Sequence, residues 1–560
     1  MNMLVSKAVL TFGMVVCGVA FAQTPPNAGS LNQQIERDQA PLSPGKAAPD
    51  IRIERDAAPA VPTADDHKIF VRSLQTTGAH AFAEAALLEA TGFSTSRELT
   101  LSELRGMASK IARYYHSHGY LLAKAYLPAQ EIKDGVVTIA VLEGHYGKVT
   151  LRNSTNLSDD LADGLLSNLK SGNAVLIAPL ETSLLLLSDV PGVNVKSTLV
   201  PGASVGASDL IVDVTPGQLV TGNVDVDNGG NRYTGANRMG ATVNINDLTG
   251  HGDVATLRAL TSGSGLNYAR ASYQVQIDRA KVGVAYASMR YRLGEEFESL
   301  QANGTAQIAS IYGSVPLIRS RSNNLYAVVN FDAKTFQDKV DSSVTRANKK
   351  ARVMMASLTG DHRDDFGGGG LSAYAFTWTT GKIGIKGAAA LATDAATVRS
   401  NGHYNKFGFN AMRLQRVTDT LSLYAAMNGQ LASKNLDTSE KMGLGGANGV
   451  RAYPEGEAYG DQGYVFNLEA RALLPRFSER QSGQMHLVGF VDTGRVKLNK
   501  NPWAVEQNRR TLSGVGIGLN WVDNNNFVVK AYYARKLGNA TATSAPDKSG
   551  RFWLQATKYF

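Results

Sequence analysis

Alternation of apolar and polar residues dominates the chain from about residue 218 to its end at Phe560. Helical spacing of apolar residues is lost there, and short period-two runs separated by Asn, Asp, Gly and Ser clusters replace it. Such runs are typical of β-strands with one apolar and one polar face. Examples of the apolar sets are Val220, Val224 and Val226; Ala241, Val243 and Ile245; Tyr273, Val275 and Ile277; and Val515, Ile517, Leu519 and Trp521. The sequence therefore predicts a large antiparallel β structure.

The first 22 residues have the pattern of a secretory signal peptide. Lys7 supplies the positive charge, residues 8–19 form an apolar core, and Ala20 and Ala22 suit a cleavage site. Because the core is short for a membrane span, we expect cleavage after Ala22 rather than an anchor. The only cysteine, Cys17, lies in this segment, which excludes disulfides, thiolate metal sites and cysteine nucleophiles from the rest of the chain.

No later stretch approaches the roughly 18 consecutive apolar residues of a spanning helix. An exported chain of this kind can cross a membrane only as a closed β-barrel, although a soluble antiparallel sheet also fits the alternation. The export signal, the Asn, Gln, Arg and Glu residues on the polar faces, and the aromatic final strand favour the barrel. At about 21 residues per strand with its connection, residues 219–560 give about 16 strands, an even number.

Two successive α/β modules are predicted ahead of the barrel, each with the order strand–helix–helix–strand–strand. In residues 67–146 the capping box Thr100-x-x-Glu103 begins a helix, and strands follow at 121–127 and 136–142. In residues 147–217 a helix follows Ser158, a second begins near Pro179, and strands follow at 193–200 and 210–215. Residues 23–40 hold a candidate polar helix with Ser30 as N-cap. Residues 41–66 contain five prolines and are expected to be an extended linker without regular structure.

Several motifs resemble those of one family. The stretch Leu99–Tyr120, with Asp134-Gly135 and Leu142-Glu143-Gly144, is similar to the first POTRA domain of the TpsB outer-membrane transporters of two-partner secretion, the haemolysin/haemagglutinin secretion/activation type. Gly449-Val450-Arg451-Ala452-Tyr453 resembles the Val-Arg-Gly-Tyr/Phe tip of that family's sixth loop, with Ala452 in place of Gly. Phe490-Val491-Asp492-Thr493-Gly494 matches the Phe-x-Asp-x-Gly of a later strand. The resemblance covers nearly the whole mature chain.

The resemblance implies two periplasmic POTRA domains, at 67–146 and 147–217, followed at 218–560 by an antiparallel transmembrane β-barrel in the outer membrane with about 16 strands. It implies a loop around residues 443–463 that folds into the lumen, and a plug helix within residues 23–40. It also implies that Arg451 pairs with Asp492 as a loop lock, with Val450, Tyr453, Phe490 and Gly494 in support. Independently of the resemblance, alternation puts Phe490 and Asp492 on one strand face.

The function that the resemblance implies is a pore that recognises an unfolded exoprotein, through unspecified residues in 67–217, and secretes it without ATP. The expected partners are a TpsA-type exoprotein and outer-membrane lipid, with the chain as a monomer. An outer-membrane barrel assembly factor, which normally carries more POTRA domains, and a soluble surface β-protein remain as alternatives. The sequence does not identify the client, which is an adhesin, a cytolysin, a haem-binding protein or a contact-dependent toxin.

No catalytic or metal-binding pattern is stronger than its structural alternative. His116 and His118 lie at a helix end without a third ligand, and Gly367–Gly370 lacks the Lys-Ser/Thr of a phosphate-binding loop. The net charge of +9 is spread over the chain without an aromatic-interleaved basic stripe, which argues against nucleic acid as a partner. We therefore expect neither an enzyme nor a metal or other cofactor.

Overall fold

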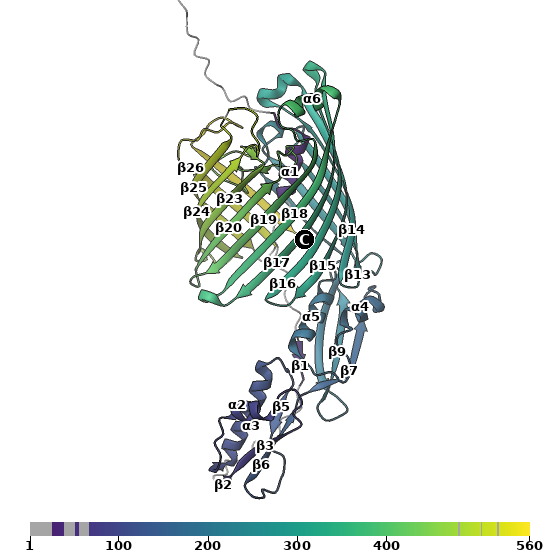
Figure 1. The fold of residues 1–560 in the computed structure, drawn as a ribbon, viewed down its shortest axis with the longest axis vertical. Coiled ribbons are helices and arrows are strands. Elements are labelled where there is room, and N and C mark those ends of the chain that lie inside the picture. Colours follow the sequence, from purple (N-terminus) through teal and green to yellow (C-terminus); the bar gives the residue numbers. More distant parts are fainter. Residues whose placement is uncertain (1–24, 39–50, 55–66, 480–481, 506, 524–525) are drawn as a thin grey trace, which may run out of the picture.

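Two small α/β domains lie one after the other beneath a tall β-barrel, and a short helix lies inside the barrel (Figure 1). The computed structural model describes residues 25–38, 51–54, 67–479, 482–505, 507–523 and 526–560. The expected signal peptide, residues 1–22, lies outside the described residues. Below, the "domain end" of the barrel is the end next to the small domains, and the "far end" is the opposite one.

The first small domain packs two helices on a three-stranded sheet of order β3-β6-β5. Helix α3 begins as predicted at Thr100, whose hydroxyl accepts the amide of Glu103 at 3.2 Å while the Glu103 carboxylate accepts the amide of Thr100 at 2.7 Å. The pairing of β2 with β4 beside this sheet was not predicted. The elements are β2 Lys68–Val71, β3 Ser73–Thr77, α2 Glu84–Thr91, β4 Arg97–Thr100, α3 Leu101–Ser117, β5 Lys124–Tyr126 and β6 Val136–Leu142.

Glu143 ties the first domain together just after β6. Its carboxylate accepts the amides of His80 and Ala81 at 2.6 and 2.7 Å and the hydroxyl of Tyr115 at 2.8 Å. Burial raises the pKa of Glu143, but the bonds from Ala81, His80 and Tyr115 favour the charged form and hold its pKa below the ordinary value. The carboxylate is therefore a pH-dependent brace between the β3–α2 connection and α3.

The second small domain is a four-stranded sheet of order β1-β8-β9-β7 covered by two helices. Its own elements are β7 His145–Asn153, α4 Asp159–Leu166, α5 Ile177–Ser188, β8 Val193–Pro201 and β9 Ala207–Pro216. The outer strand β1, Ile51–Ile53, comes from the linker, where the prediction of no regular structure was wrong. It pairs in parallel with β8, and Ile51 and Ile53 pack against the domain's core. The prolines lie outside this three-residue strand and so do not prevent it.

Sixteen antiparallel strands close into the barrel, as predicted. The first strand pairs with the last, from Asn223 opposite Tyr559 to Asp227 opposite Gln555. The strands are β10 Val220–Asp227, β11 Arg238–Asn246, β12 Val254–Thr261, β13 Leu266–Ile277, β14 Ala280–Arg292, β15 Ala302–Arg319, β16 Asn323–Val340, β17 Thr345–Asp364, β18 Gly370–Lys386, β19 Gly402–Arg416, β20 Leu421–Ala432, β23 Gln462–Leu473, β24 Gln484–Lys497, β25 Arg509–Asp523, β26 Phe527–Lys536 and β27 Gly550–Tyr559.

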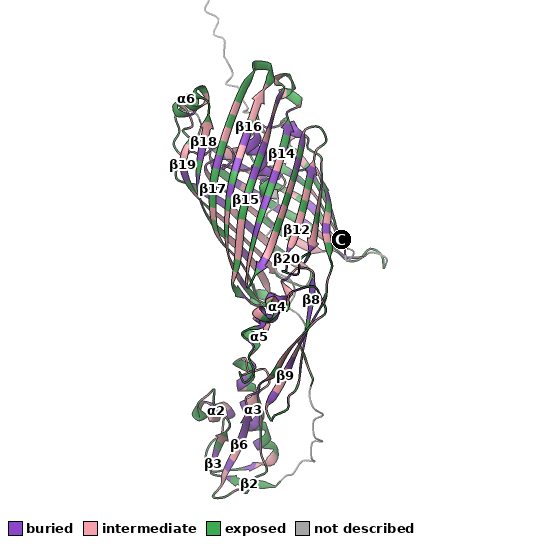
Figure 2. Ribbon diagram, turned by 90° about the vertical axis from the view of Figure 1, so that its right-hand side faces the viewer, coloured by how far each residue is buried: buried purple, intermediate pink, exposed green. Residues whose placement is uncertain are grey.

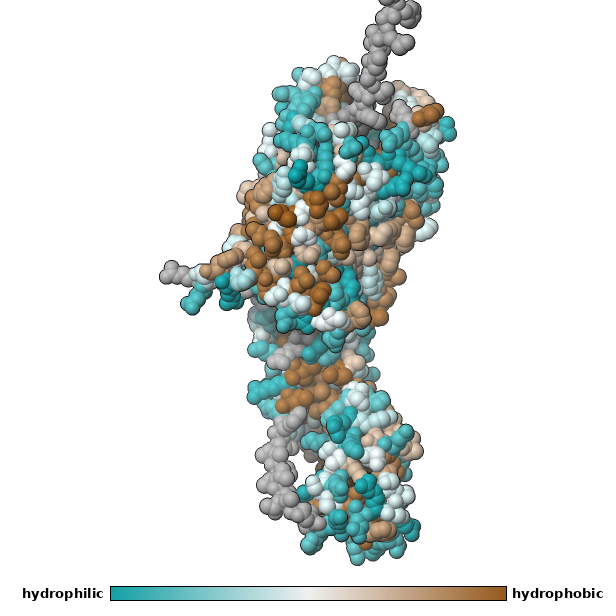
Figure 3. All heavy atoms as spheres, turned by 90° about the vertical axis from the view of Figure 1, so that its left-hand side faces the viewer, coloured by the Kyte–Doolittle hydropathy of each residue, from teal (hydrophilic) through white to brown (hydrophobic). Residues whose placement is uncertain are grey.

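Buried and exposed residues alternate along the barrel strands (Figure 2), as the period-two pattern predicts. The exposed positions carry large apolar side chains such as Leu257, Ile311, Trp378 and Ile517. The side of the outer wall seen in Figure 3 has a broad apolar area, with hydrophilic residues towards the far end. An apolar outer band suits a wall that faces lipid.

Smaller elements connect or brace these parts. Four 3₁₀ turns, η1 Arg232–Thr234, η2 Glu295–Leu300, η3 Asp341–Ser343 and η4 Phe366–Gly368, lie between barrel strands, and helix α6, Ala388–Ala396, connects β18 to β19 at the far end. At the domain end, Arg319 donates to both carboxylate oxygens of Asp189, at 2.6 and 2.9 Å, and so joins the β15–β16 turn to the end of α5. Among the described helices none is long and apolar enough to cross a membrane.

Candidate functional site inside the barrel

Helix α1, Ala28–Asp38, lies within the lumen towards the far end (Figure 1). Asn27 caps it, not Ser30 as predicted: the Asn27 side chain accepts the amide of Ser30 at 3.0 Å. Leu31 and Ile35 are buried in a cluster with inward-facing wall residues of β12–β16. Tyr268, Met289, Tyr291, Ala306 and Phe336 belong to that cluster. An apolar stripe on an otherwise polar helix thus seats it against one side of the wall.

The polar face of α1 meets the loop between β20 and β23, residues 433–461. Arg37 reaches both carboxylate oxygens of Glu455 at 2.6 Å. The amide of Gln34 donates to the hydroxyl of Tyr459, and that of Gln33 donates to the carbonyl of Lys441. The helix is therefore held between the wall and this loop, which we call the inner loop.

The inner loop folds back into the barrel as a hairpin. Its strands β21, Met442–Gly443, and β22, Tyr459–Gly460, pair antiparallel, and the tip carries the predicted Val450-Arg451-Ala452-Tyr453 motif. Val450, Ala452 and Tyr453 are fully buried with Phe490 and other wall residues in one apolar cluster. Burial of these side chains holds the tip against β24 and β25.

Arg451 and Asp492, the predicted lock pair, lie in direct contact. Arg451 Nε donates to Asp492 Oδ2 at 2.9 Å and Nη2 donates to Oδ1 at 2.7 Å, while the Arg451 amide donates to Oδ2 at 3.1 Å. Arg451 is 4% exposed and Asp492 is 0% exposed. A bidentate, charge-assisted pair of this kind fixes both the position and the orientation of the tip.

Three residues that were not predicted as site residues contact Arg451 or its partner Asp492. Its Nη1 donates to Glu469 at 2.7 Å, and its carbonyl accepts the indole N–H of Trp553 at 2.7 Å. Asn467 donates to Asp492 at 2.8 Å and to the Gly449 carbonyl at 3.0 Å. In the sequence Asn467 and Glu469 alternate with Phe466 and Leu468, which puts them on a polar strand face. The pairing of β23 with β24 then places Asn467 opposite Asp492. This polar strand face could have been used to predict Asn467 and Glu469 as site residues.

The supporting motif residues act through close packing. The guanidinium of Arg451 lies 3.5 Å from the centre of the Phe490 ring, within cation–π range. A Cβ at Gly494 would come within 2.5 Å of Leu444 Cδ1, so this position has no room for a side chain. Ala452 is not among the residues with positive φ, and its Cβ occupies the space that a side chain at Gly514 would need. Alanine therefore fits at the tip without backbone strain.

Two further polar clusters hold the inner loop. Glu457 is fully buried and accepts the amides of Thr543 and Ser544 at 2.9 and 2.8 Å, which ties the loop to the β26–β27 connection. Glu440 forms ion pairs with Lys406 at 2.8 Å and with Lys334 at 3.4 Å. Lys334 also lies 3.7 Å from Glu36 of α1. The contacts in the lumen are thus mainly between side chains, and many of them are charged.

His116 and His118, the two histidines at the helix end, both contact backbone carbonyls. His116 contacts the carbonyl of Ala123 at 2.9 Å, and His118 contacts that of Tyr114 at 2.8 Å. Within the described ranges, no three His, Cys, Asp or Glu side chains are placed to hold a metal ion.

Comparisons with known proteins agree with this architecture. The family described as haemolysin secretion/activation protein ShlB/FhaC/HecB matches residues 206–521, and the ShlB-type POTRA domain matches residues 69–144. The heme/hemopexin transporter protein HuxB of Haemophilus influenzae strain 86-028NP is 29% identical over 99% of both chains. The outer membrane transporter CdiB of Dickeya dadantii strain 3937 is 22% identical over 66% of both chains.

Solved structures share the fold. CdiB from Escherichia coli has a TM-score of 0.70 at 18% identity, covering 97% of this chain and 100% of that chain. BamA from Haemophilus ducreyi lacking POTRA domains 1–3 has a TM-score of 0.52 at 13% identity, covering 88% and 100%. The small domains are therefore POTRA domains in the periplasm, and the far end of the barrel is the cell-surface end. The chain belongs to the ShlB/FhaC/HecB family of outer-membrane two-partner secretion transporters, which act with secreted exoprotein partners.

Proposed function

We propose that this chain passes its exoprotein partner through its own lumen in an unfolded state, without ATP and without catalysing a reaction, once α1 and the inner loop have left. The occupied lumen carries this proposal. Within the described residues no backbone–backbone hydrogen bond joins α1 to the wall, so the helix can leave without unpairing any strand. Side-chain contacts in a polar lumen can be exchanged for water, which keeps the cost of release moderate.

Client capture is assigned to the POTRA sheets, within residues 67–217. An extended segment can add to a free sheet edge by main-chain pairing. In the second POTRA domain the outer edge of β8 is occupied by β1, which contributes only three paired residues. The plug helix precedes β1 in the same chain, so a client that displaces β1 from β8 also frees the segment that leads to α1. Client binding would in this way favour the unplugged state.

The outer wall of the barrel indicates a lipid partner and a monomeric state. The apolar band of the barrel takes outer-membrane lipid as its solvent. The wall is closed by the chain's own first and last strands, which supports a monomer as the secreting unit.

The decisive test is single-channel conductance in planar bilayers together with secretion of the partner in cells. Deletion of residues 25–38 should raise the conductance, because the helix that fills the lumen is removed. An assembly factor would show a defect in the insertion of other barrels when the chain is deleted, with no partner retained in the periplasm. Unchanged conductance after the deletion, combined with such an insertion defect, would contradict the proposal.

A further inference from the structure

Charged residues on the lipid-facing wall are distributed very unevenly between its two ends. At the cell-surface end, outward positions carry cations such as Arg292, Lys350, Arg352 and Lys382. Their strand neighbours Tyr291, Ala351 and Ile383 are buried and point into the barrel, so the cations point away from it. No Asp or Glu occupies an outward position in the cell-surface half of the described strands. At the periplasmic end the outward residue Asp364 is present, paired with Arg413 at 2.8 Å.

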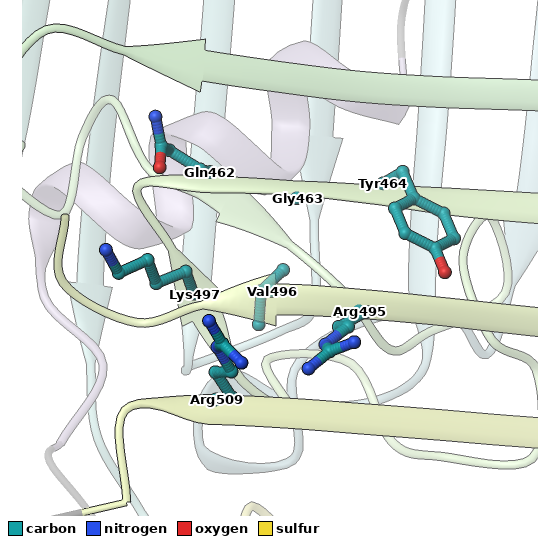
Figure 4. A pocket seen from close by; sticks show the side chains of 7 residues that line it. All are labelled: Gln462, Gly463, Tyr464, Arg495, Val496, Lys497 and Arg509. Carbon is teal, nitrogen blue, oxygen red and sulfur yellow. The ribbon is translucent and has the colours of Figure 1, made fainter.

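A hollow in this cationic rim lies across β23, β24 and β25. It measures about 280 Å³ and is lined by the side chains of Gln462, Tyr464, Arg495, Lys497 and Arg509 (Figure 4). Val496 and Leu512 are buried inside the barrel, so their strand neighbours Arg495, Lys497 and Arg509 point outward, away from the lumen. The hollow therefore opens on the outside of the wall, at the cell-surface ends of three adjacent strands.

The three cations of the hollow have no acidic partner within the described part of the chain. Lys497 lies directly opposite Arg509 in the register of β24 and β25, and Arg495 lies one outward position below Lys497. Like charges directly opposite each other destabilise a sheet. An external anion in the hollow would remove this repulsion, and Arg495 and Arg509 can each donate two hydrogen bonds to one phosphate.

The wall below the hollow indicates what carries that anion. Past the hydrogen-bonded pair Thr493 and Ser513, the same outward faces of β23, β24 and β25 carry three exposed apolar side chains, Leu468, Val491 and Val515. An occupant that fits both parts has a phosphorylated headgroup at the rim and apolar chains along the wall. Tyr464 lines the hollow directly opposite Arg495, near the level where amphipathic rings prefer to sit.

We propose that this hollow binds the phosphate group of an outer-leaflet membrane lipid, with Arg495, Lys497 and Arg509 as ligands and Leu468, Val491 and Val515 against its acyl chains. A second pair of the same kind supports this assignment. Arg352 lies directly opposite Lys382 on β17 and β18, with the apolar Met354 one outward position and Trp378 two outward positions further from the rim. Bound lipid at such sites would fix the height of the barrel in the outer leaflet.

The test compares the full chain with its Lys497→Gln/Arg509→Gln variant in detergent micelles. Bound lipid is counted by native mass spectrometry during titration with bis-phosphorylated lipid A, and again with the dephosphorylated lipid. Each Lys or Arg near an anionic lipid surface contributes about fivefold in affinity, so the double variant should bind the phosphorylated lipid about 30-fold more weakly. Lys497→Arg/Arg509→Lys should bind like the unmodified chain, because both charges remain.

The control variant Lys124→Gln/Lys148→Gln removes the same charge from the exposed surface of the POTRA domains and should leave lipid binding unchanged. Resistance of the folded barrel to unfolding in cold SDS shows that each variant is assembled. Equal affinity of the rim variant and the unmodified chain would overturn the proposal, as would equal affinity for the dephosphorylated lipid. If inorganic phosphate displaced the lipid and bound the hollow as tightly as the lipid does, free phosphate and not a lipid would be the source of the anion.

Discussion

Arg451→Ala is the substitution with the largest expected effect on the inner loop. It removes the bidentate pair with Asp492 and the 2.7 Å bond to Glu469, and it leaves two buried carboxylates without that cation. Breaking a buried pair by removing one partner costs about 3–5 kcal/mol. When the tip leaves the wall, both carboxylates regain water, so this cost falls on the docked state alone. At about 1.4 kcal/mol per tenfold, the docked population should drop by roughly 10³-fold relative to the undocked one.

The assay uses the absence of cysteine after Cys17. Val450 at the loop tip is fully buried, so Val450→Cys provides a thiol that a maleimide reaches only when the tip undocks. Labelling of this thiol should become roughly 10³-fold faster in the Arg451→Ala background, in proportion to the undocked population, while the barrel stays assembled. We also expect secretion of the partner to fall, because an inner loop without its anchor no longer returns to one position.

Arg471→Ala is the matched control. Arg471 also pairs with Glu469, at 2.7 Å, but it is partly exposed and leaves the bond between Arg451 and Glu469 in place. Its removal should change the labelling rate of the thiol at position 450 by less than about tenfold, as expected for a partly exposed pair. If Arg451→Ala and Arg471→Ala gave the same labelling rate, the bidentate pair would not be what holds the tip.

Four further outcomes are expected. Ile35→Asp, which buries a carboxylate in the apolar seat of α1, should raise the bilayer conductance, whereas Ile35→Leu should not. Ile53→Ser should speed hydrogen exchange in β8 by weakening the short pairing with β1, and unchanged exchange would mean that β1 does not protect that edge. Glu457→Ala should make residues 537–549 more sensitive to added protease, because their amides lose a buried acceptor, and equal digestion would rule out the tie. Glu143 has a lowered pKa, so its stabilising effect is complete above the ordinary pKa near 4.5 and is lost as pH falls through the lower pKa of the folded state. Hydrogen-exchange protection in the first POTRA domain should therefore decrease at acid pH, and Glu143→Gln should abolish this decrease. An identical pH profile of the variant and the unmodified chain would contradict the prediction.

The barrel could be predicted from sequence because each strand repeats a local signal. Period-two alternation places Val515, Ile517 and Leu519 outward without any knowledge of the neighbouring strands, and about 21 residues per strand and connection then gives the strand number. The three-residue strand β1 could not be predicted in this way. Ile51 and Ile53 are too few to show a period, and their pairing with β8 depends on residues far along the chain.

The prediction of the pair between Arg451 and Asp492 from the sequence has a similar limit. Arg451 and Asp492 were paired through the resemblance of their two motifs to a family, and the shared strand face of Phe490 and Asp492 supported the pair. The contribution of Trp553 could not be predicted, because it depends on barrel closure, which brings β27 to the loop tip. Glu469 was within reach of the pattern, since it faces the lumen on the strand next to Asp492. Local patterns thus predict which residues face the lumen, while the pairing among them requires the closed barrel.

The contacts of the plug helix and of the inner loop differ in a way that bears on the order of opening. The helix takes partners from the loop at Glu455, Tyr459 and Lys441, whereas the tip is held by Asp492 of the wall. Departure of α1 therefore leaves the bidentate pair intact. Departure of the loop removes several partners of α1 and leaves its apolar seat, the bond from the Ala28 amide to Asp338 and the ion pair of Glu36 with Lys334. We infer that the helix leaves first and that the tip undocks second, so that deletion of the helix opens the lumen in part while the pair between Arg451 and Asp492 persists.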